Sequence, residues 1–137
     1  MQTLYPASIV PGEGGYFVQF ADLPEAFSDG ETMEEALFNA AEVLTLTLKG
    51  RIAEGMAVPE PSRHVPDAHY IAPDAKTQAA LLLRAARGEK SHAELARALS
   101  TSWDVAKRLE DPNHWPNLKS LDRAAAALGK RLLLTLE

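Results

Sequence analysis

The sequence of 137 residues contains no cysteine and no long apolar segment. Without cysteine the chain has no disulfide, no thiolate metal ligand and no cysteine nucleophile, a composition that fits a reducing compartment. Its longest apolar runs, such as Ala124–Leu128, fall far short of the roughly 20 residues that span a membrane. The first residues, Met1–Leu4, lack the basic start and apolar stretch of a secretory signal. We therefore expect a cytoplasmic protein that is not associated with a membrane.

Patterns for metal binding and catalysis are also scarce. No two histidines stand at a helical metal-ligand spacing among His64, His69, His92 and His114. A two-metal nuclease needs several inward carboxylates, but Asp22 opens a loop, and Glu34 and Glu35 lie in a helix-capping turn. The glycine-rich segment Pro11–Gly15 connects two expected strands, which favours a hairpin turn over a phosphate cradle. We expect no metal, no cofactor and no catalytic residue.

Charge is distributed unevenly along the chain, although its net value is only −5. Residues 1–75 hold three basic and twelve acidic side chains, a net charge of −9. Residues 76–137 hold eleven basic and seven acidic side chains, a net charge of +4. Such asymmetry indicates different partners for the two halves. The acidic half suits a basic partner, and the basic half suits the phosphates of a nucleic acid.

The first half of the chain predicts an α+β fold with a β-β-β-α-β order. Strands are expected over Leu4–Val10, Tyr16–Phe20 and Ala26–Ser28, and a last one over Ala68–Ala72. Pro6 places the first strand at the edge of a sheet or at a bulge, because proline cannot donate to a ladder.

One long helix is expected after the third strand. The segment Thr32–Glu35 is a capping box, in which the Thr32 hydroxyl accepts from a backbone amide and Glu35 reaches back. Gly55 and Pro59 mark the end of the helix. Apolar residues at three- or four-residue spacing form one stripe, made of Met33, Leu37, Ala40, Leu44, Leu48 and Ile52.

The second half predicts an all-α domain that ends in a short strand. Helices are expected over Thr77–Arg87, after the capping residues Ser91 and Ser102, and over Leu118–Leu128. Together with the first half, this pattern predicts domains over residues 1–73 and 77–137.

The terminal segment is expected to join two chains. Leu132–Leu136 predicts a strand whose unpaired edge would invite association, so cross-chain pairing is the natural arrangement. The residues expected at this contact are Leu132, Leu134 and Leu136. A homodimer is therefore predicted, with a tetramer as a further possible assembly.

Residues 94–110 look like a helix-turn-helix. Ala96 is small where two helices must cross closely. Apolar residues are spaced to fill the angle between the helices, namely Leu99, Ala106 and Leu109. The turn carries Ser100 where such motifs usually have glycine, and Ser102 suits the N-cap of the second helix.

The DNA contacts expected from this motif lie mainly on its second helix. They are made by Ser102, Trp103, Asp104, Lys107 and Arg108. Arg and Lys can contact guanine edges or phosphates, and Asp can accept from cytosine. Contacts to phosphate are also expected from His92, Asn117 and Lys119. The alternative is a pair of amphipathic helices that binds no nucleic acid, in which Trp103 covers the helix junction.

Several segments of the chain, in the same order, resemble HicB-type antitoxins. The likeness to their C-terminal Cro-like helix-turn-helix domain rests on Leu95, Arg108–His114, Leu121–Ala124 and Leu128–Leu132. The likeness in the first half rests on Tyr5–Ala7, Gly14–Phe20, Asp22–Pro24 and Gly30–Thr32. One departure is Glu25-Ala26, where the family often has Gly-Cys.

The resemblance implies a partial ribonuclease-H-like N-terminal domain that binds and blocks a HicA-type toxin, a small protein that cleaves messenger RNA. It also implies a second domain that binds operator DNA and represses the protein's own operon. The chain itself would be no enzyme. The residues expected at the toxin are Tyr5, Tyr16, Phe17, Asp22, Leu23, Pro24, Phe27 and Asp29. Of these, Tyr5, Phe17 and Phe27 are expected to be exposed apolar anchors.

Two other functions remain open from the residues alone. A transcription regulator with a small-molecule-sensing N-terminal domain would require a deep apolar pocket rather than an acidic face. A nuclease built on the N-terminal fold would show metal-dependent RNA cleavage that is lost when Asp22 is replaced.

Overall fold

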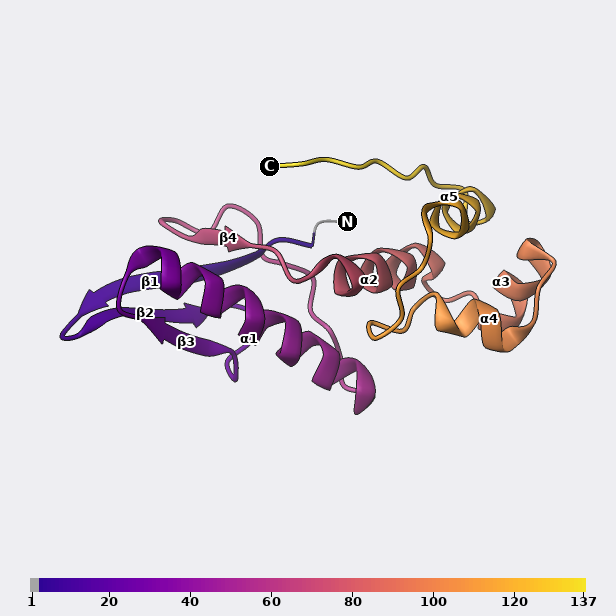
Figure 1. Cartoon of the computed structure of the whole chain (residues 1–137). Helices are drawn as coiled ribbons and strands as arrows, with labels where there is room; N and C mark the ends of the chain where they lie inside the picture. The colour runs from indigo at the N-terminus through magenta and orange to yellow at the C-terminus, as the bar shows by residue number, and fades with distance from the viewer. Residues whose placement is uncertain (1–2) are drawn as a thin grey trace. The chain divides into compact units, whose positions relative to one another are not determined.

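The computed structural model describes residues 3–137 and divides into two compact units (Figure 1). Unit 1 ends at Ala75, and unit 2 runs from Lys76 to Glu137. The chain therefore passes from one unit to the other at the point where its charge changes sign.

Unit 1 is an antiparallel sheet with one long helix. Its elements are β1 (Tyr5–Gly12), β2 (Gly15–Phe20), β3 (Phe27–Gly30), α1 (Met33–Ala53) and β4 (His69–Ile71). The strands lie in the order β3-β2-β1-β4. The predicted α+β class and the β-β-β-α-β order are confirmed.

The prediction that Pro6 places the first strand at an edge or at a bulge is wrong. β1 pairs with both β2 and β4, and its register with β4 runs one-to-one through Pro6 without an extra residue. Pro6 is tolerated in this central strand because its carbonyl faces the β2 side, where the Ala21 N–H donates to it at 3.0 Å. Since β2 has already ended at Phe20, no ladder bond needs an N–H from Pro6. The strand also continues beyond its predicted end, through Pro11–Gly12.

The predicted N-cap Thr32 at the start of α1 is confirmed. The Thr32 hydroxyl accepts from the Glu35 N–H at 3.1 Å. The helix ends at Ala53, just before Gly55, which has the positive φ of 70° that favours glycine.

The buried stripe of α1 differs in its first turns from the predicted one. It consists of Ala36, Ala40, Leu44 and Leu48. Met33 and Leu37, by contrast, are each 36 % exposed. The cause is a close approach, since a Cβ atom placed on Gly30 would lie only 2.3 Å from the Ala36 nitrogen. A large side chain would not fit where α1 meets β3 so closely.

Unit 2 is built from short helices. They are α2 (Ala75–Arg87), α3 (His92–Leu99), α4 (Trp103–Arg108) and α5 (Leu118–Ala127). The predicted N-caps are confirmed, because Ser91 Oγ accepts from the Glu94 N–H and Ser102 Oγ accepts from the Val105 N–H. One core joins the helices, made of Leu83, Leu95, Ala96, Ala106, Leu109, Ala124 and Leu128.

The turn between α3 and α4 contains a strained residue. Ser100 adopts the left-handed conformation, with φ 53° and ψ 46°. Side chains other than glycine pay a steric cost there of roughly 1–2 kcal/mol, which is partly offset by their lower entropy when unfolded. We predict that Ser100→Gly raises the free energy of unfolding of unit 2 by up to about 1 kcal/mol. Denaturant unfolding followed by tryptophan fluorescence would measure this, and a loss of stability would contradict it.

The expected terminal strand is absent from this single chain, where residues 130–137 have no regular secondary structure. A strand forms only by hydrogen bonding to another strand, and unit 2 contains only helices as regular elements. Leu132 in this tail is half-buried, whereas Leu133 is 73 % exposed, Leu134 is 67 % exposed and Leu136 is fully exposed.

Across residues 3–137, no helix combines the length and the apolar character needed to cross a membrane. Within the same part of the chain, no group of three or more histidine or carboxylate side chains is placed to hold a metal ion.

Candidate functional site

Two of the residues predicted to contact a toxin lie in the core of unit 1. Tyr5 and Leu23 have no exposed surface. The Tyr5 hydroxyl donates to the Pro59 carbonyl at 2.7 Å, and burial, aided by the nearby Asp22 carboxylate, raises the pKa of Tyr5 to about 12. The prediction that Tyr5 is an exposed anchor is therefore wrong, because its hydroxyl holds the loop that follows α1.

The Asp22 carboxylate also holds this loop. It accepts hydrogen bonds from both the backbone N–H and the hydroxyl of Ser62, 40 residues along the chain. Tyr70 supports the same loop, since its hydroxyl donates to the Ser62 carbonyl at 3.0 Å and accepts from the Val65 N–H. These contacts give Asp22 a structural role in the chain, and they do not place it in a group of carboxylates that could bind metal.

Of the remaining candidates, Phe17, Phe27 and Asp29 lie on the side of the sheet that α1 leaves uncovered. Tyr16 is half-buried and, by alternation along β2, lies on the same side as Val18 and Phe20. Pairing places Ser8, Gln19 and Phe27 in one row and Val10, Phe17 and Asp29 in the next. The large apolar members of these rows are well exposed: Val10 at 55 %, Phe17 at 49 % and Phe27 at 66 %. Val18 and Phe20, which alternate with them along β2, are buried on the α1 side. Pro24 is exposed in the loop between β2 and β3.

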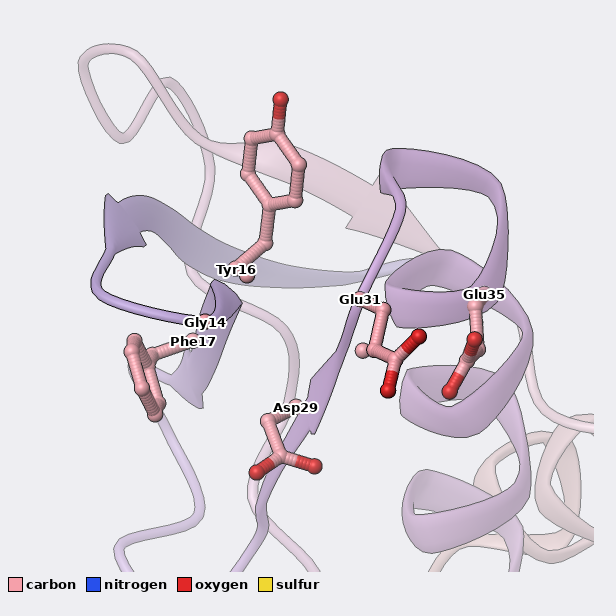
Figure 2. Close-up of a pocket in the computed structure, with 8 residues that line it drawn as sticks. Gly14, Tyr16, Phe17, Asp29, Glu31 and Glu35 are labelled. Carbon is pink, nitrogen blue, oxygen red and sulfur yellow. The ribbon is translucent and has the colours of Figure 1, made fainter.

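Carboxylates gather at the end of the sheet where β2, β3 and α1 meet. Figure 2 shows Asp29, Glu31 and Glu35 around a hollow beside Tyr16 and Phe17. The hollow has a volume of about 290 Å³. A second hollow, of about 410 Å³, is lined by Thr32, Glu34, Glu35 and Phe38. Both lie at the surface among carboxylates, so neither is the deep apolar pocket that a small-molecule sensor would need.

Basic side chains of unit 1 are mostly engaged with its own acids. Lys49 lies 3.6 Å from Asp74. Arg51 donates to both carboxylate oxygens of Glu25, at 2.7 and 2.9 Å, and these hydrogen bonds lower the pKa of Glu25 to about 2. At the Glu25-Ala26 position, Glu25 therefore forms an ion pair at the surface of unit 1, and Ala26 is fully buried in its core.

The second candidate surface is the exposed side of α4 in unit 2. Ser102, Asp104 and Arg108 are exposed, as is Lys107. The Lys107 ammonium lies over the Trp103 ring, 4.8 Å from its centroid. Trp103 is 48 % exposed, so it does not simply cover the helix junction. The helix therefore presents cationic groups and an aromatic ring together.

His92 lies next to this surface and faces inward. Its ring meets the Trp103 ring edge-on, with 6.0 Å between centroids, and its Nε2 atom lies 3.3 Å from the Glu110 carboxylate. Asn117 and Lys119, also predicted to contact phosphate, are exposed at the start of α5, where Asn117 accepts from the Ser120 N–H at 2.8 Å.

A largely buried ion pair joins the end of α2 to the residues that follow α4, and sequence reasoning missed it. Arg87 at the end of α2 donates to both oxygens of Glu110, at 2.6 and 3.0 Å. Glu110 is only 7 % exposed. The two residues lie 23 positions apart, so the sequence signal is limited to a glutamate beside the core residue Leu109.

Comparison with known proteins finds similarity to HicB antitoxins along both units. Residues 4–79 match the model of a family described as the HicB-like antitoxin of bacterial toxin–antitoxin systems. Antitoxin HicB of Escherichia coli K12 is 34 % identical over 135 residues, which cover 96 % of this chain and 98 % of that protein. Antitoxin HicB 1 of Photorhabdus laumondii is 31 % identical over 97 % of this chain and 86 % of its own length. Antitoxin HicB of Pseudomonas fluorescens Pf0-1 is 30 % identical over 97 % of this chain and 93 % of its own length.

Proposed function

The chain belongs to the HicB-like antitoxin family, and we propose that it neutralises a HicA-type toxin and represses its own operon. Its relatives are regulatory toxin–antitoxin proteins rather than typical enzymes, and an antitoxin implies a toxin as its partner. The protein would act in the cytoplasm, where both messenger RNA and operator DNA are found.

Unit 1 is the part that we assign to the toxin. Its net charge of −9 would attract a basic, RNA-cleaving protein. Toxin contacts are proposed for the exposed or half-exposed members of the predicted set, which are Tyr16, Phe17, Pro24, Phe27 and Asp29. Neutralisation would occur by steric cover of the toxin's active site, without catalysis. The element order of unit 1 fits the partial ribonuclease-H-like fold implied by the resemblance.

Unit 2 is the part that we assign to DNA. We interpret α3, the turn through Ser100 and α4 as a helix-turn-helix, with α4 lying in the major groove. Direct contacts would come from Trp103, Asp104, Lys107 and Arg108, and Ser102 would lie at the end of the helix nearest the bases. A homodimer would place two such helices in successive grooves, joined through the leucines of the terminal tail, Leu132, Leu134 and Leu136.

Replacement of Arg108 by alanine tests this assignment. Arg108 is exposed in the last turn of α4, so its loss should leave the fold unchanged. We expect operator binding to weaken by roughly 1–3 kcal/mol, with inhibition of the toxin unchanged. Fluorescence anisotropy on a labelled operator fragment would measure the first quantity, and RNA cleavage by the toxin would measure the second. A loss of toxin inhibition in this variant would argue against one partner per unit.

The observation that carries the proposal is the likeness to antitoxins over both units, together with the reversal of charge at their boundary. Co-expression with the small basic protein encoded in the adjoining reading frame, followed by purification of the complex, tests the toxin partner directly. If the two proteins did not copurify and RNA cleavage continued in the presence of this chain, the proposed function would be rejected.

A further inference from the structure

The uncovered side of the sheet in unit 1 exposes three large apolar side chains among polar ones. An antiparallel sheet with one solvated side normally alternates apolar residues inward with polar residues outward. Here Val10 and Phe17 lie directly opposite each other on β1 and β2, and Phe27 on β3 is diagonal to Phe17. Neighbours on adjacent strands are about 5 Å apart when directly opposite and about 7–8 Å apart on the diagonal, so the three side chains project from the same side of the sheet in adjacent rows. We call Val10, Phe17 and Phe27 the sheet patch.

The sheet patch is held in place by the strands beneath it. A Cβ atom on Gly12 would lie 2.5 Å from the Phe17 Cε2 atom, so the Phe17 ring lies across this glycine. Gln19, in the row beside the patch, donates through its amide to the carbonyl of Ala26 at 3.1 Å and thereby fixes the loop that leads to Phe27. The Phe17 ring and the backbone that leads to Phe27 are therefore held in place without a partner, which lowers the entropy cost of binding.

The charges around the sheet patch favour a basic partner. No lysine or arginine lies in β1, β2, β3 or β4. Asp29 stands directly opposite Phe17, and Glu31 and Glu35 lie at the same end of the sheet (Figure 2). A second copy of unit 1 would bring another net charge of −9 against this surface, whereas a cationic protein would meet complementary charge.

The outer side of α1 also exposes apolar residues, but it is less suited to docking. Phe38 is 64 % exposed and Leu46 is 68 % exposed. They lie eight residues apart on the helix, about 12 Å along its axis, with Glu42 between them. Isolated exposed apolar residues of this kind are common on soluble proteins.

We propose that the toxin docks on the sheet patch, with basic groups of the toxin facing Asp29, Glu31 and Glu35, and that the outer side of α1 stays free of it. This inference rests on the proposed antitoxin function and adds the surface through which it operates. Phe17 and Phe27 are the anchors of the contact, because buried aromatic side chains at the centre of an interface contribute most to affinity.

The test compares two matched double variants of the full chain. Phe17→Ser with Phe27→Ser removes the anchors of the sheet patch, and Phe38→Ser with Leu46→Ser removes two exposed apolar residues of similar size from α1. Each is titrated against the purified toxin from the adjoining reading frame, with cleavage of a messenger RNA as the readout. We expect the first variant to inhibit at least 30-fold less strongly and the second to stay within about 3-fold of the unchanged chain. Near-ultraviolet circular dichroism of the tyrosines, all three of which lie in unit 1, confirms that both remain folded.

A third variant keeps the apolar residues and changes only their arrangement. Gly12→Ala would push the Phe17 ring aside, and we expect inhibition to weaken about 5- to 10-fold.

The possible outcomes distinguish failure of the proposed antitoxin function from failure of the sheet patch as the docking surface. Failure of the unchanged chain to inhibit the toxin would reject the proposed function. Inhibition that survives loss of Phe17 and Phe27, or that is lost with Phe38 and Leu46, would overturn the sheet patch alone. If the Phe17→Ser, Phe27→Ser variant differed from the unchanged chain in oligomeric state when no toxin is present, the sheet patch would bind a second copy of the chain. That result would also overturn the sheet patch as the docking surface for the toxin.

Discussion

Replacing Gly30 by alanine is expected to destabilise unit 1 by about 3 kcal/mol or more. A Cβ atom at this position would lie 2.3 Å from the Ala36 nitrogen, 2.7 Å from its Cα atom and 2.8 Å from the Glu35 carbonyl carbon. These are backbone atoms of α1, which cannot rotate away as a side chain would. The helix must therefore move off β3, and its buried face loses contacts with the sheet.

The two units can be followed separately in the same unfolding experiment. Tyrosines occur only at positions 5, 16 and 70, and tryptophans only at 103 and 115, so each aromatic type reports on one unit. In Gly30→Ala the tyrosine-detected transition should shift to lower denaturant, while the tryptophan-detected transition stays in place. Gly50→Ala is the matched control, since a Cβ atom there meets nothing within 4 Å and alanine favours the helix. An unchanged tyrosine transition in Gly30→Ala would show that α1 and β3 do not approach as described.

Replacing Glu110 by alanine is expected to destabilise unit 2 by about 3 kcal/mol. The change leaves the Arg87 guanidinium, whose side chain is only 16 % exposed, without its bidentate partner. Removing one member of a buried pair typically costs roughly 3–5 kcal/mol, and we expect the low end because Arg87 can partly turn to solvent. The change also removes the carboxylate beside His92, whose ring contacts Trp103.

Tryptophan fluorescence during denaturant unfolding measures this effect. Glu89→Ala serves as the control, because Glu89 is exposed in the turn after α2 and has the same charge. Its stability should stay within about 0.5 kcal/mol of the unchanged chain. If Glu110→Ala were equally harmless, the ion pair would have no part in holding α4 in place.

Features set by local sequence were predicted well. Thr32, Ser91 and Ser102 are caps whose bonds reach only three residues ahead, so the residue type and spacing suffice to identify them. The order of strands and helices in unit 1, and the helices of unit 2, follow from hydrophobic period and from glycine and proline positions in the same way. The strand expected over Leu132–Leu136 was wrong for the single chain, because it depends on a second strand to pair with.

Features that depend on distant partners were missed. Tyr5 was expected to be exposed, but its hydroxyl meets a carbonyl 54 residues away in a loop without regular structure. The Arg87–Glu110 pair likewise joins elements that only the folded unit brings together. Pro6 misled the interpretation of β1, because whether a missing N–H matters depends on where the neighbouring strand ends. The residues that share the uncovered side of the sheet could be identified only once the register of β1, β2 and β3 was known.

The central claim is that each unit serves one partner, and it is tested most directly by measuring both partners on the same two variants. The Phe17→Ser, Phe27→Ser variant and the Arg108→Ala variant would each be assayed for toxin inhibition and for operator affinity at one fixed salt concentration. We predict a crossed result, in which the first variant loses inhibition and keeps operator affinity, and the second does the reverse. A parallel loss of both activities in either variant, with both units still folded, would contradict the claim.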